Sequence, residues 1–150
     1  MCARLGSDLN VCLSGGCELA TSRGEAVKKL PSAKYDVTLV KPKNVGITAK
    51  EAYTKYSLKR NKPKTNRTEN MMIALLDGAS IKPYLYNDLE LAIFNDYEEL
   101  KQIKSHYPEA VMSGSGSTYF VLENLAQNTL GDDYEFINGL HFVDEGVSEY

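Results

Sequence analysis

Val-Met-Ser-Gly-Ser-Gly-Ser-Thr-Tyr-Phe, residues 111–120, places two glycines between two short runs of strand-forming residues. Gly114 and Gly116 carry no side chain, so the backbone there can approach a ligand closely and aim several N–H groups into one concavity. Such a loop can hold a phosphate without a charged side chain. A hairpin turn that needs small residues would explain the same run. The apolar residues on both sides favour the phosphate-binding interpretation.

The composition indicates a soluble globular protein with no general affinity for polyanions. The chain has 150 residues, enough for one domain or one domain and a piece of another. Its residues are 43% hydrophobic and 25% charged, and the net charge is -3. A weakly acidic chain is not expected to bind nucleic acid or acidic membranes. The single basic stretch, residues 59–64, lacks interleaved aromatic residues and indicates a solvated loop.

The three cysteines, Cys2, Cys12 and Cys17, form no CxxC motif and have no histidine nearby. Neither a structural zinc site nor a disulfide framework is expected, and no other metal site is predicted. No apolar run approaches the ~18 residues that a membrane span needs. Arg4 and Asp8 interrupt any apolar core of a signal peptide. A cytoplasmic protein is therefore expected, or a stromal one if the source is a plant with plastids.

Turn signals and apolar periodicity predict an α+β fold, in which helices lie on one face of a small, mostly antiparallel sheet. The expected elements, in chain order, are a β-hairpin over 11–22, a strand over 36–41, a helix over 49–57, a helix starting at 68–70, a helical region over 87–107 broken near 95–96, strands flanking a loop over 110–122, a short helix over 124–130 and an edge strand over 139–143. Met71, Met72, Leu75 and Leu76 are expected to form the inner face of the second helix.

Five segments in one order resemble the C-terminal half of the 4-diphosphocytidyl-2-C-methyl-D-erythritol kinase family, in the GHMP kinase superfamily. They are residues 4–9, 15–25, 41–49, 87–90 and 112–117. Each motif alone is weak, but five in register are specific, and they extend over nearly the whole chain. The resemblance implies a remnant of the N-terminal kinase domain over 1–33, followed by the C-terminal domain over 34–150. The abrupt start at residues 1–8 also suggests a fragment.

The resemblance implies a small-molecule kinase that uses ATP and Mg²⁺. The family transfers a phosphoryl group to the 2-hydroxyl of 4-diphosphocytidyl-2-C-methyl-D-erythritol, in non-mevalonate isoprenoid precursor synthesis. The family's main nucleotide-binding element, a glycine-rich loop opening a helix, has no counterpart in these 150 residues. We therefore expect the chain to act with the N-terminal half of the same enzyme and to be inactive alone.

Asp8 matches the catalytic aspartate of the family by resemblance. That residue accepts the proton of the attacking hydroxyl or orients the hydroxyl, which suits a reaction that depends mostly on positioning. The residues alone favour an ordinary helix-capping or turn-forming aspartate instead. One departure is Asn10, which stands where the family usually has proline, so the backbone after Asp8 is less constrained.

The serine–glycine loop (residues 113–117) resembles the third GHMP motif, which lies beside the transferred phosphate. The resemblance thus places Gly114, Ser115, Gly116 and Ser117 at the substrate or phosphate. Main-chain N–H donors there would stabilise charge on the transferred group.

Two further residues, Arg23 and Thr48, are candidates for anion binding. Arg23 could reach a diphosphate, although an ion pair with Glu25 is the simpler role. Thr48 begins a helix where N–H groups could bind an anion, and a capping box with Glu51 is again simpler. Asn87, with Asp88 beside it, is expected to cap a helix rather than touch a ligand.

Two other functions remain open from the sequence. The first is another GHMP kinase, acting on homoserine, mevalonate or a sugar; residues 23–25 and 87–90 favour the diphosphocytidyl enzyme over these. The second is a non-catalytic α+β module that binds a ligand or a partner, or a remnant that binds nothing.

Overall fold

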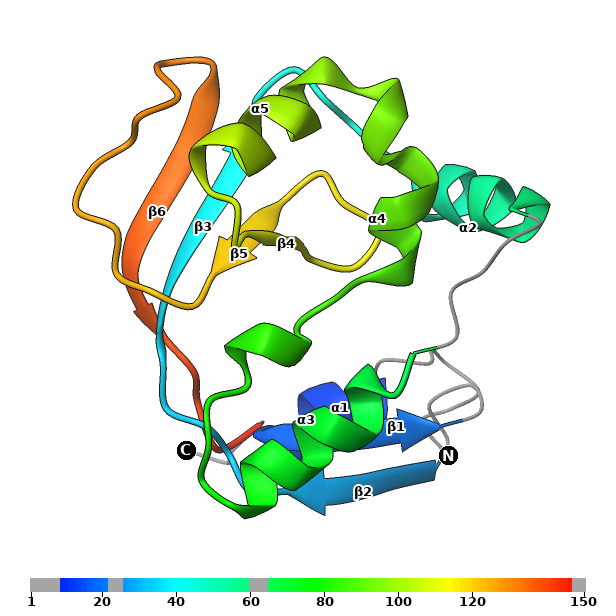
Figure 1. The fold of residues 1–150 in the computed structure, drawn as a ribbon, viewed down its shortest axis with the longest axis vertical. Helices are drawn as coiled ribbons and strands as arrows, with labels where there is room; N and C mark the ends of the chain where they lie inside the picture. The colour runs from blue at the N-terminus through cyan, green and yellow to red at the C-terminus, as the bar shows by residue number, and fades with distance from the viewer. Residues whose placement is uncertain (1–8, 22–25, 60–64, 147–150) are drawn as a thin grey trace.

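The computed structural model describes residues 9–21, 26–59 and 65–146, and these form two antiparallel sheets with helices (Figure 1). The expected α+β class is confirmed. The helices are α1 (Leu9–Ser14), α2 (Ala49–Leu58), α3 (Arg67–Leu76), α4 (Asp88–Ile93) and α5 (Glu98–His106), with 3-10 turns η2 (Lys82–Tyr84) and η3 (Phe94–Asp96). The strands are β1 (Cys17–Thr21), β2 (Ala26–Leu30), β3 (Asp36–Pro42), β4 (Val111–Met112), β5 (Tyr119–Val121) and β6 (Tyr134–His141).

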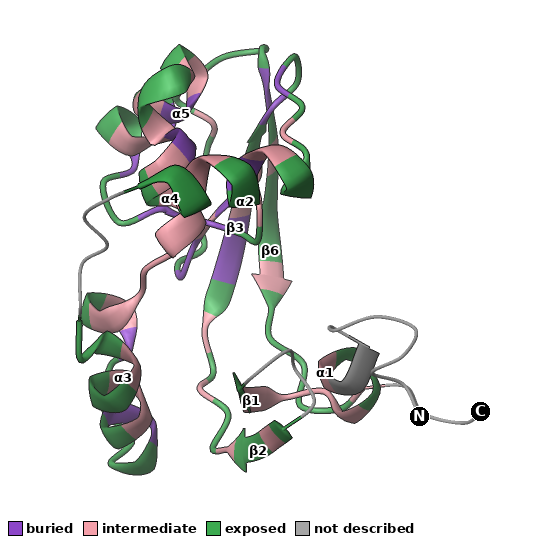
Figure 2. Cartoon of the chain, turned by 90° about the vertical axis from the view of Figure 1, so that its right-hand side faces the viewer, coloured by how far each residue is buried: buried purple, intermediate pink, exposed green. Residues whose placement is uncertain are grey.

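The larger sheet has the strand order β4-β5-β3-β6, and every neighbouring pair is antiparallel. Helices α4 and α5 lie over one of its faces, and the buried residues gather between β3 and these helices (Figures 1 and 2). The smaller sheet is the β1–β2 hairpin, at the other end of the molecule. The expected domain boundary at 33/34 falls between β2 and β3, and it stays a prediction.

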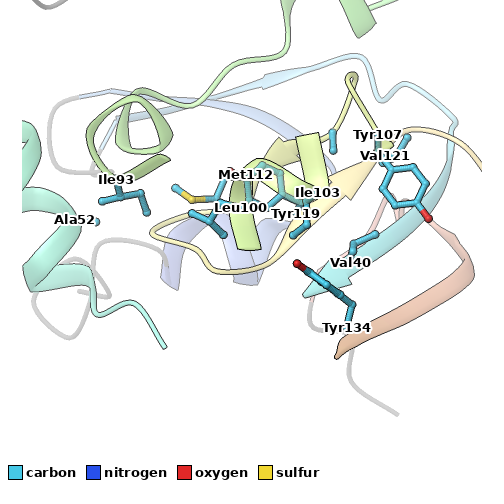
Figure 3. Close-up of a cluster of buried hydrophobic side chains, with 11 residues drawn as sticks. Val40, Ala52, Ile93, Leu100, Ile103, Tyr107, Met112, Tyr119, Val121 and Tyr134 are labelled. Atoms are coloured by element: carbon cyan, nitrogen blue, oxygen red, sulfur yellow. The ribbon is translucent and has the colours of Figure 1, made fainter. Parts of the chain in front are cut away.

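The main core forms where α5 packs on the sheet. Leu100 and Ile103 lie three residues apart on α5 and are fully buried, as the helical periodicity predicts. They meet side chains from β3, β4 and β5, among them Val40 and Tyr119, both at 0% exposure. Figure 3 shows this cluster extending from Ala52 and Ile93 at one end to Val40 and Tyr134 at the other.

A second cluster joins α3 to the larger sheet. Ala74 and Leu75 on α3 are buried with Val37 of β3 and Leu122, which follows β5. Met71 packs against this cluster, as expected. Leu76 does not, because it is 66% exposed, so the inner face of α3 is narrower than predicted.

The hairpin predicted over 11–22 is wrong in position. Residues Leu9–Ser14 form α1, and the hairpin is made by β1 and β2, paired from Cys17↔Leu30 to Thr21↔Ala26. The Gly15 N–H donates to the Val11 carbonyl at 2.9 Å, and Gly15 has a φ of 63°. The Ser-Gly-Gly run therefore ends a helix in a left-handed cap instead of turning a hairpin.

The short helix predicted over 124–130 is also wrong, since this part of the described chain forms bends only. Side chains satisfy its backbone. The buried Thr38 hydroxyl donates to the Glu123 carbonyl at 2.7 Å and accepts from the Leu125 N–H at 3.0 Å. Asn128 accepts from the Leu130 N–H at 2.9 Å, an Asx turn that competes with helix formation.

The final strand lies at the sheet edge as predicted, but it is longer and earlier than 139–143. Strand β6 spans Tyr134–His141 and pairs with β3 alone in the larger sheet. Tyr134 is buried and Phe136 packs against the core, so alternation begins five residues before the predicted start. The register shifts between Val37 and Leu39, where the pairing is irregular.

Candidate functional site

The serine–glycine loop joins β4 to β5 as a tight turn (yellow in Figure 1). The Ser113 N–H donates to the Thr118 carbonyl at 2.8 Å, and the Gly116 N–H donates to the Ser113 carbonyl at 3.0 Å. Gly114 and Gly116 have φ values of 56° and 89°, a region in which other residues are strained. The two glycines are thus required by the backbone path of the turn.

The loop packs closely against the segment between β3 and α2. A Cβ atom on Gly116 would lie 2.7 Å from Met112 Sδ and 3.4 Å from Ile47 Cδ1. The Ser117 side chain is buried, at 4% exposure, and its hydroxyl donates to the Val45 carbonyl at 2.7 Å. This hydrogen bond joins two segments 72 residues apart in the chain.

A shallow groove of about 590 Å³ lies between the loop and this segment. Its lining residues are Lys41, Lys43, Asn44, Val45, Gly46, Ile47, Gly116, Ser117 and Thr118. Lys41 lies 3.7 Å from a Glu135 carboxylate oxygen, and both side chains are about half exposed, so the pair is weak. The groove therefore offers two cations beside a glycine turn, an arrangement suited to an anion.

Thr48 caps α2, as the capping-box pattern predicts. Its hydroxyl oxygen accepts from the Glu51 N–H at 3.1 Å. The reciprocal half of the box is absent among the described contacts of Glu51, whose carboxylate accepts instead from Lys55 and Tyr97, both at 2.7 Å. Thr48 follows directly on Ile47, so α2 begins at the end of the groove.

A charged network holds α2 against the start of α5. Lys55 lies 2.7 Å from Glu51 and 2.9 Å from Asp96, and it stacks over the Tyr97 ring at 5.4 Å. Hydrogen bonds from Lys55 and then Tyr97 lower the pKa of Glu51. The bonds to Glu51 and Asp96 raise the pKa of Lys55. These contacts fix the helix that follows the groove.

Asn87 caps α4, again as predicted, because its Oδ1 accepts from the Leu89 N–H at 2.9 Å. Asp88 accepts from the Tyr56 hydroxyl at 3.2 Å, which links α4 to α2. Neither residue lines the groove beside the loop. Sequence reasoning missed two groups of this groove, the Lys43 side chain and the Val45 carbonyl. Neighbouring residues in the sequence give no sign that the serine–glycine loop, more than 65 residues later, packs against residues 43–45.

The predicted site residues are only partly brought together by the structure. Gly116 and Ser117 line the groove, and Thr48 directly follows Ile47, a lining residue on the opposite side. The Gly116 N–H and the Ser117 hydroxyl are already used within the protein, which leaves the N–H groups of Gly114, Ser115, Ser117 and Thr118 without a described acceptor. Of these four residues, only Ser117 and Thr118 line the groove. Asp8 and Arg23 lie outside the described residues.

The described residues hold neither a cluster of metal-ligating side chains nor a membrane-spanning helix. Three or more His, Cys, Asp or Glu side chains nowhere gather among them in a position to hold a metal ion. A membrane-spanning helix is not found in that part of the chain either, and α2 and α3 have only 10 residues each.

Replacing Ser117 with Ala should destabilise the protein by about 1–2 kcal/mol, because the buried Val45 carbonyl loses its described donor. Urea unfolding measures the loss. Ser105→Ala is the matched control, since Ser105 bonds the Gln102 carbonyl at 2.8 Å on an exposed helix face. Equal stability changes in the two variants would contradict the structural role given to Ser117.

No model of a known protein family matches the chain. Individual relatives, however, point to one kinase family. The chain is 37% identical over 127 residues to the 4-diphosphocytidyl-2-C-methyl-D-erythritol kinase of Desulfitobacterium hafniense, covering 79% of this chain and 43% of that protein. It is 32% identical over 158 residues to the same kinase of Caldanaerobacter subterraneus, covering 97% and 54%. The resemblance to this kinase family is confirmed.

A solved structure supports the same relationship. The crystal structure of a 4-(cytidine 5'-diphospho)-2C-methyl-D-erythritol kinase superposes with a TM-score of 0.55 at 25% identity, over 70% of this chain and 40% of that one. The chain spans about half the length of the curated relatives it matches. The similarity therefore covers one half of the kinase fold.

Proposed function

We propose that this chain is the C-terminal part of an ATP-dependent kinase that phosphorylates the 2-hydroxyl of 4-diphosphocytidyl-2-C-methyl-D-erythritol. The observation that carries the proposal is the serine–glycine loop, whose turn faces a groove containing Lys41 and Lys43. A phosphate seated there would meet main-chain N–H groups and two cations, which is what transfer of a phosphoryl group requires. The family supplies the identity of the acceptor alcohol.

The described residues fit one end of a nucleotide, the phosphates. The Lys43 ammonium and the N–H groups of Ser117 and Thr118 would bind and orient a phosphate in the groove. Gly114 and Ser115 do not line the groove, and their N–H groups are proposed as further donors from the same loop. ATP, bound with Mg²⁺, supplies the phosphoryl group. The rest of the nucleotide site, and the contacts to the cytidine, are assigned to the N-terminal half of the enzyme, with residues 1–33 as the remnant of that domain.

Asp8 and Arg23 complete the proposed site from outside the described residues. Asp8 would accept or orient the proton of the attacking hydroxyl, by its match to the catalytic aspartate of the family. Arg23 and Thr48 would contribute to diphosphate binding. We further propose that the chain alone does not turn over and that the enzyme works in the cytoplasm.

The test is a chimaera in which this chain replaces the matching C-terminal half of the Caldanaerobacter kinase, which it matches over 97% of its length. ADP formation is followed with 4-diphosphocytidyl-2-C-methyl-D-erythritol, homoserine, mevalonate and galactose in turn. The proposal expects turnover with the first alcohol only. Turnover with one of the others would overturn the substrate assignment.

A folded chimaera that is inactive on all four alcohols would favour the non-catalytic alternative. The matched control is the intact Caldanaerobacter kinase, assayed beside the chimaera at equal concentration. Circular dichroism and size-exclusion chromatography establish that the chimaera is folded and monodisperse before its activity is scored. Inactivity of the 150-residue chain by itself is the expected result.

A further inference from the structure

The outer edge of β4 has no neighbouring strand among the described residues, since the sheet ends there. Two side chains of the α4 region occupy that edge instead. Glu90 Oε2 accepts from the Met112 N–H at 3.1 Å, and Asn87 Nδ2 donates to the Met112 carbonyl at 2.7 Å. These are the two backbone groups that a paired strand would have satisfied.

Asn87 reaches further, into the serine–glycine loop itself. The same Nδ2 also donates to the Gly114 carbonyl at 2.8 Å, while Oδ1 caps α4. One amide side chain therefore fixes both a helix start and the first turn of the loop. Because both ends of the amide are used, no other side chain of similar size satisfies all three backbone groups.

Glu90 is held in turn by charged and polar neighbours. Its side chain is only 12% exposed, and its Oε1 lies 3.9 Å from Lys104 Nζ. Lys104 also donates to the Ala110 carbonyl at 2.6 Å, just before β4. Tyr119 is fully buried nearby, and burial, followed by the negative charge of Glu90, raises the pKa of its hydroxyl. Polar contacts thus run along the strand edge from Met112 through Glu90 and Lys104 to the Ala110 carbonyl.

We propose that Asn87 and Glu90 are positioning residues for the serine–glycine loop. They hold its β4 side, and the Ser117–Val45 hydrogen bond holds its β5 side. The N–H groups of the loop that have no described acceptor, those of Gly114, Ser115, Ser117 and Thr118, are then fixed in place before a phosphate arrives. A loop that is ordered in advance binds its ligand without a further entropic cost and presents its donors in a constant geometry. Only the nature of the ligand rests on the proposed kinase function.

The experiment compares Asn87→Ser with Asn128→Ser in the 150-residue chain. Serine keeps the helix-capping oxygen of Asn87 but lacks the amide donor to Met112 and Gly114. Asn128 is a matched control, because it accepts from the Leu130 N–H and donates to the Gly131 carbonyl at 2.8 Å in a remote loop. The readout is amide hydrogen exchange of Gly116, whose N–H closes the turn.

Asn87→Ser should speed exchange at Gly116 by about tenfold or more, as the loss of hydrogen bonds to two carbonyls implies. Asn128→Ser should leave that rate unchanged. An unchanged rate in Asn87→Ser, or equal acceleration in both variants, would overturn the proposal. This readout involves no kinase assay, so it stands even if the proposed function fails.

Glu90 provides the second variant pair. Glu90→Gln retains an oxygen that can accept from the Met112 N–H, whereas Glu90→Ala removes it. Exchange at Gly116 should stay near the wild-type rate in Glu90→Gln and rise in Glu90→Ala. In the chimaeric kinase, assayed well below the melting temperature of each variant, Asn87→Ser should lower kcat/KM about tenfold or more, while Asn128→Ser leaves it unchanged. Retained kcat/KM in an active chimaera would overturn the positioning role.

Discussion

Asp8→Asn should lower the turnover of the chimaeric kinase by about 10²–10⁴, the usual contribution of a general base or key orienting group. Asparagine has nearly the same shape as aspartate but cannot accept the proton of the attacking hydroxyl. Substrate binding should change little, because the amide can still hydrogen-bond the alcohol. Single-turnover measurement of phosphoryl transfer, with substrate in excess of its dissociation constant, separates the two effects.

The matched control for this prediction is Asp132→Asn. Asp132 is exposed in the connection before β6, and its replacement changes the net charge by the same amount. Turnover should stay within a few-fold of the unmodified chimaera. If the turnover of Asp8→Asn also falls only a few-fold, Asp8 is not the catalytic aspartate and the proposed catalytic assignment is wrong.

Elements with strong local signals were predictable from the sequence. The Thr48 hydroxyl fixes the start of α2, and buried Leu100 and Ile103 fix the inward face of α5. Both rest on rules that act within a few residues, capping and helical periodicity. The central strand β3 followed from its run of β-branched residues, of which Val40 is fully buried.

Short apolar runs were not predictable in the same way. Residues 11–13 fit a strand or a helix equally well, because three residues do not establish a period. Gly15 decided the outcome by capping α1. Residues 124–130 look helical in isolation, but the Thr38 hydroxyl, 85 residues away from Glu123, binds the backbone at the start of that segment. Contacts at this separation leave no signal in a local pattern.

In the candidate site too, some features were predictable from the local sequence and others depended on distant contacts. The glycines of the serine–glycine loop were evident from the sequence, since a turn with positive φ requires them. The partners that hold the loop were not evident, because Val45 and Glu90 reach it through tertiary packing. Asn87 was correctly predicted as a helix cap. Its second bond, to the loop, uses the other end of the same amide.

Gly116→Ala should be the most damaging substitution in the loop, with a loss of about 2–4 kcal/mol in the free energy of unfolding. Two costs combine. Alanine is strained at a φ of 89°, and its Cβ would lie 2.7 Å from the sulfur of Met112, which is only 1% exposed and cannot move away freely. Urea unfolding at equilibrium gives the loss directly, and the chimaeric kinase should lose at least tenfold in kcat/KM, because the turn that presents the phosphate donors is displaced.

Gly114→Ala separates these two costs. Gly114 also has a positive φ, 56°, but no atom lies within 4 Å of a Cβ built there. Only the backbone strain applies, so the expected loss is about 1–2 kcal/mol. The difference between the two variants therefore measures the close packing of Gly116 against Met112. Equal losses would show that the loop relaxes away from β4, and that the tight approach on which the phosphate site depends is not maintained in solution.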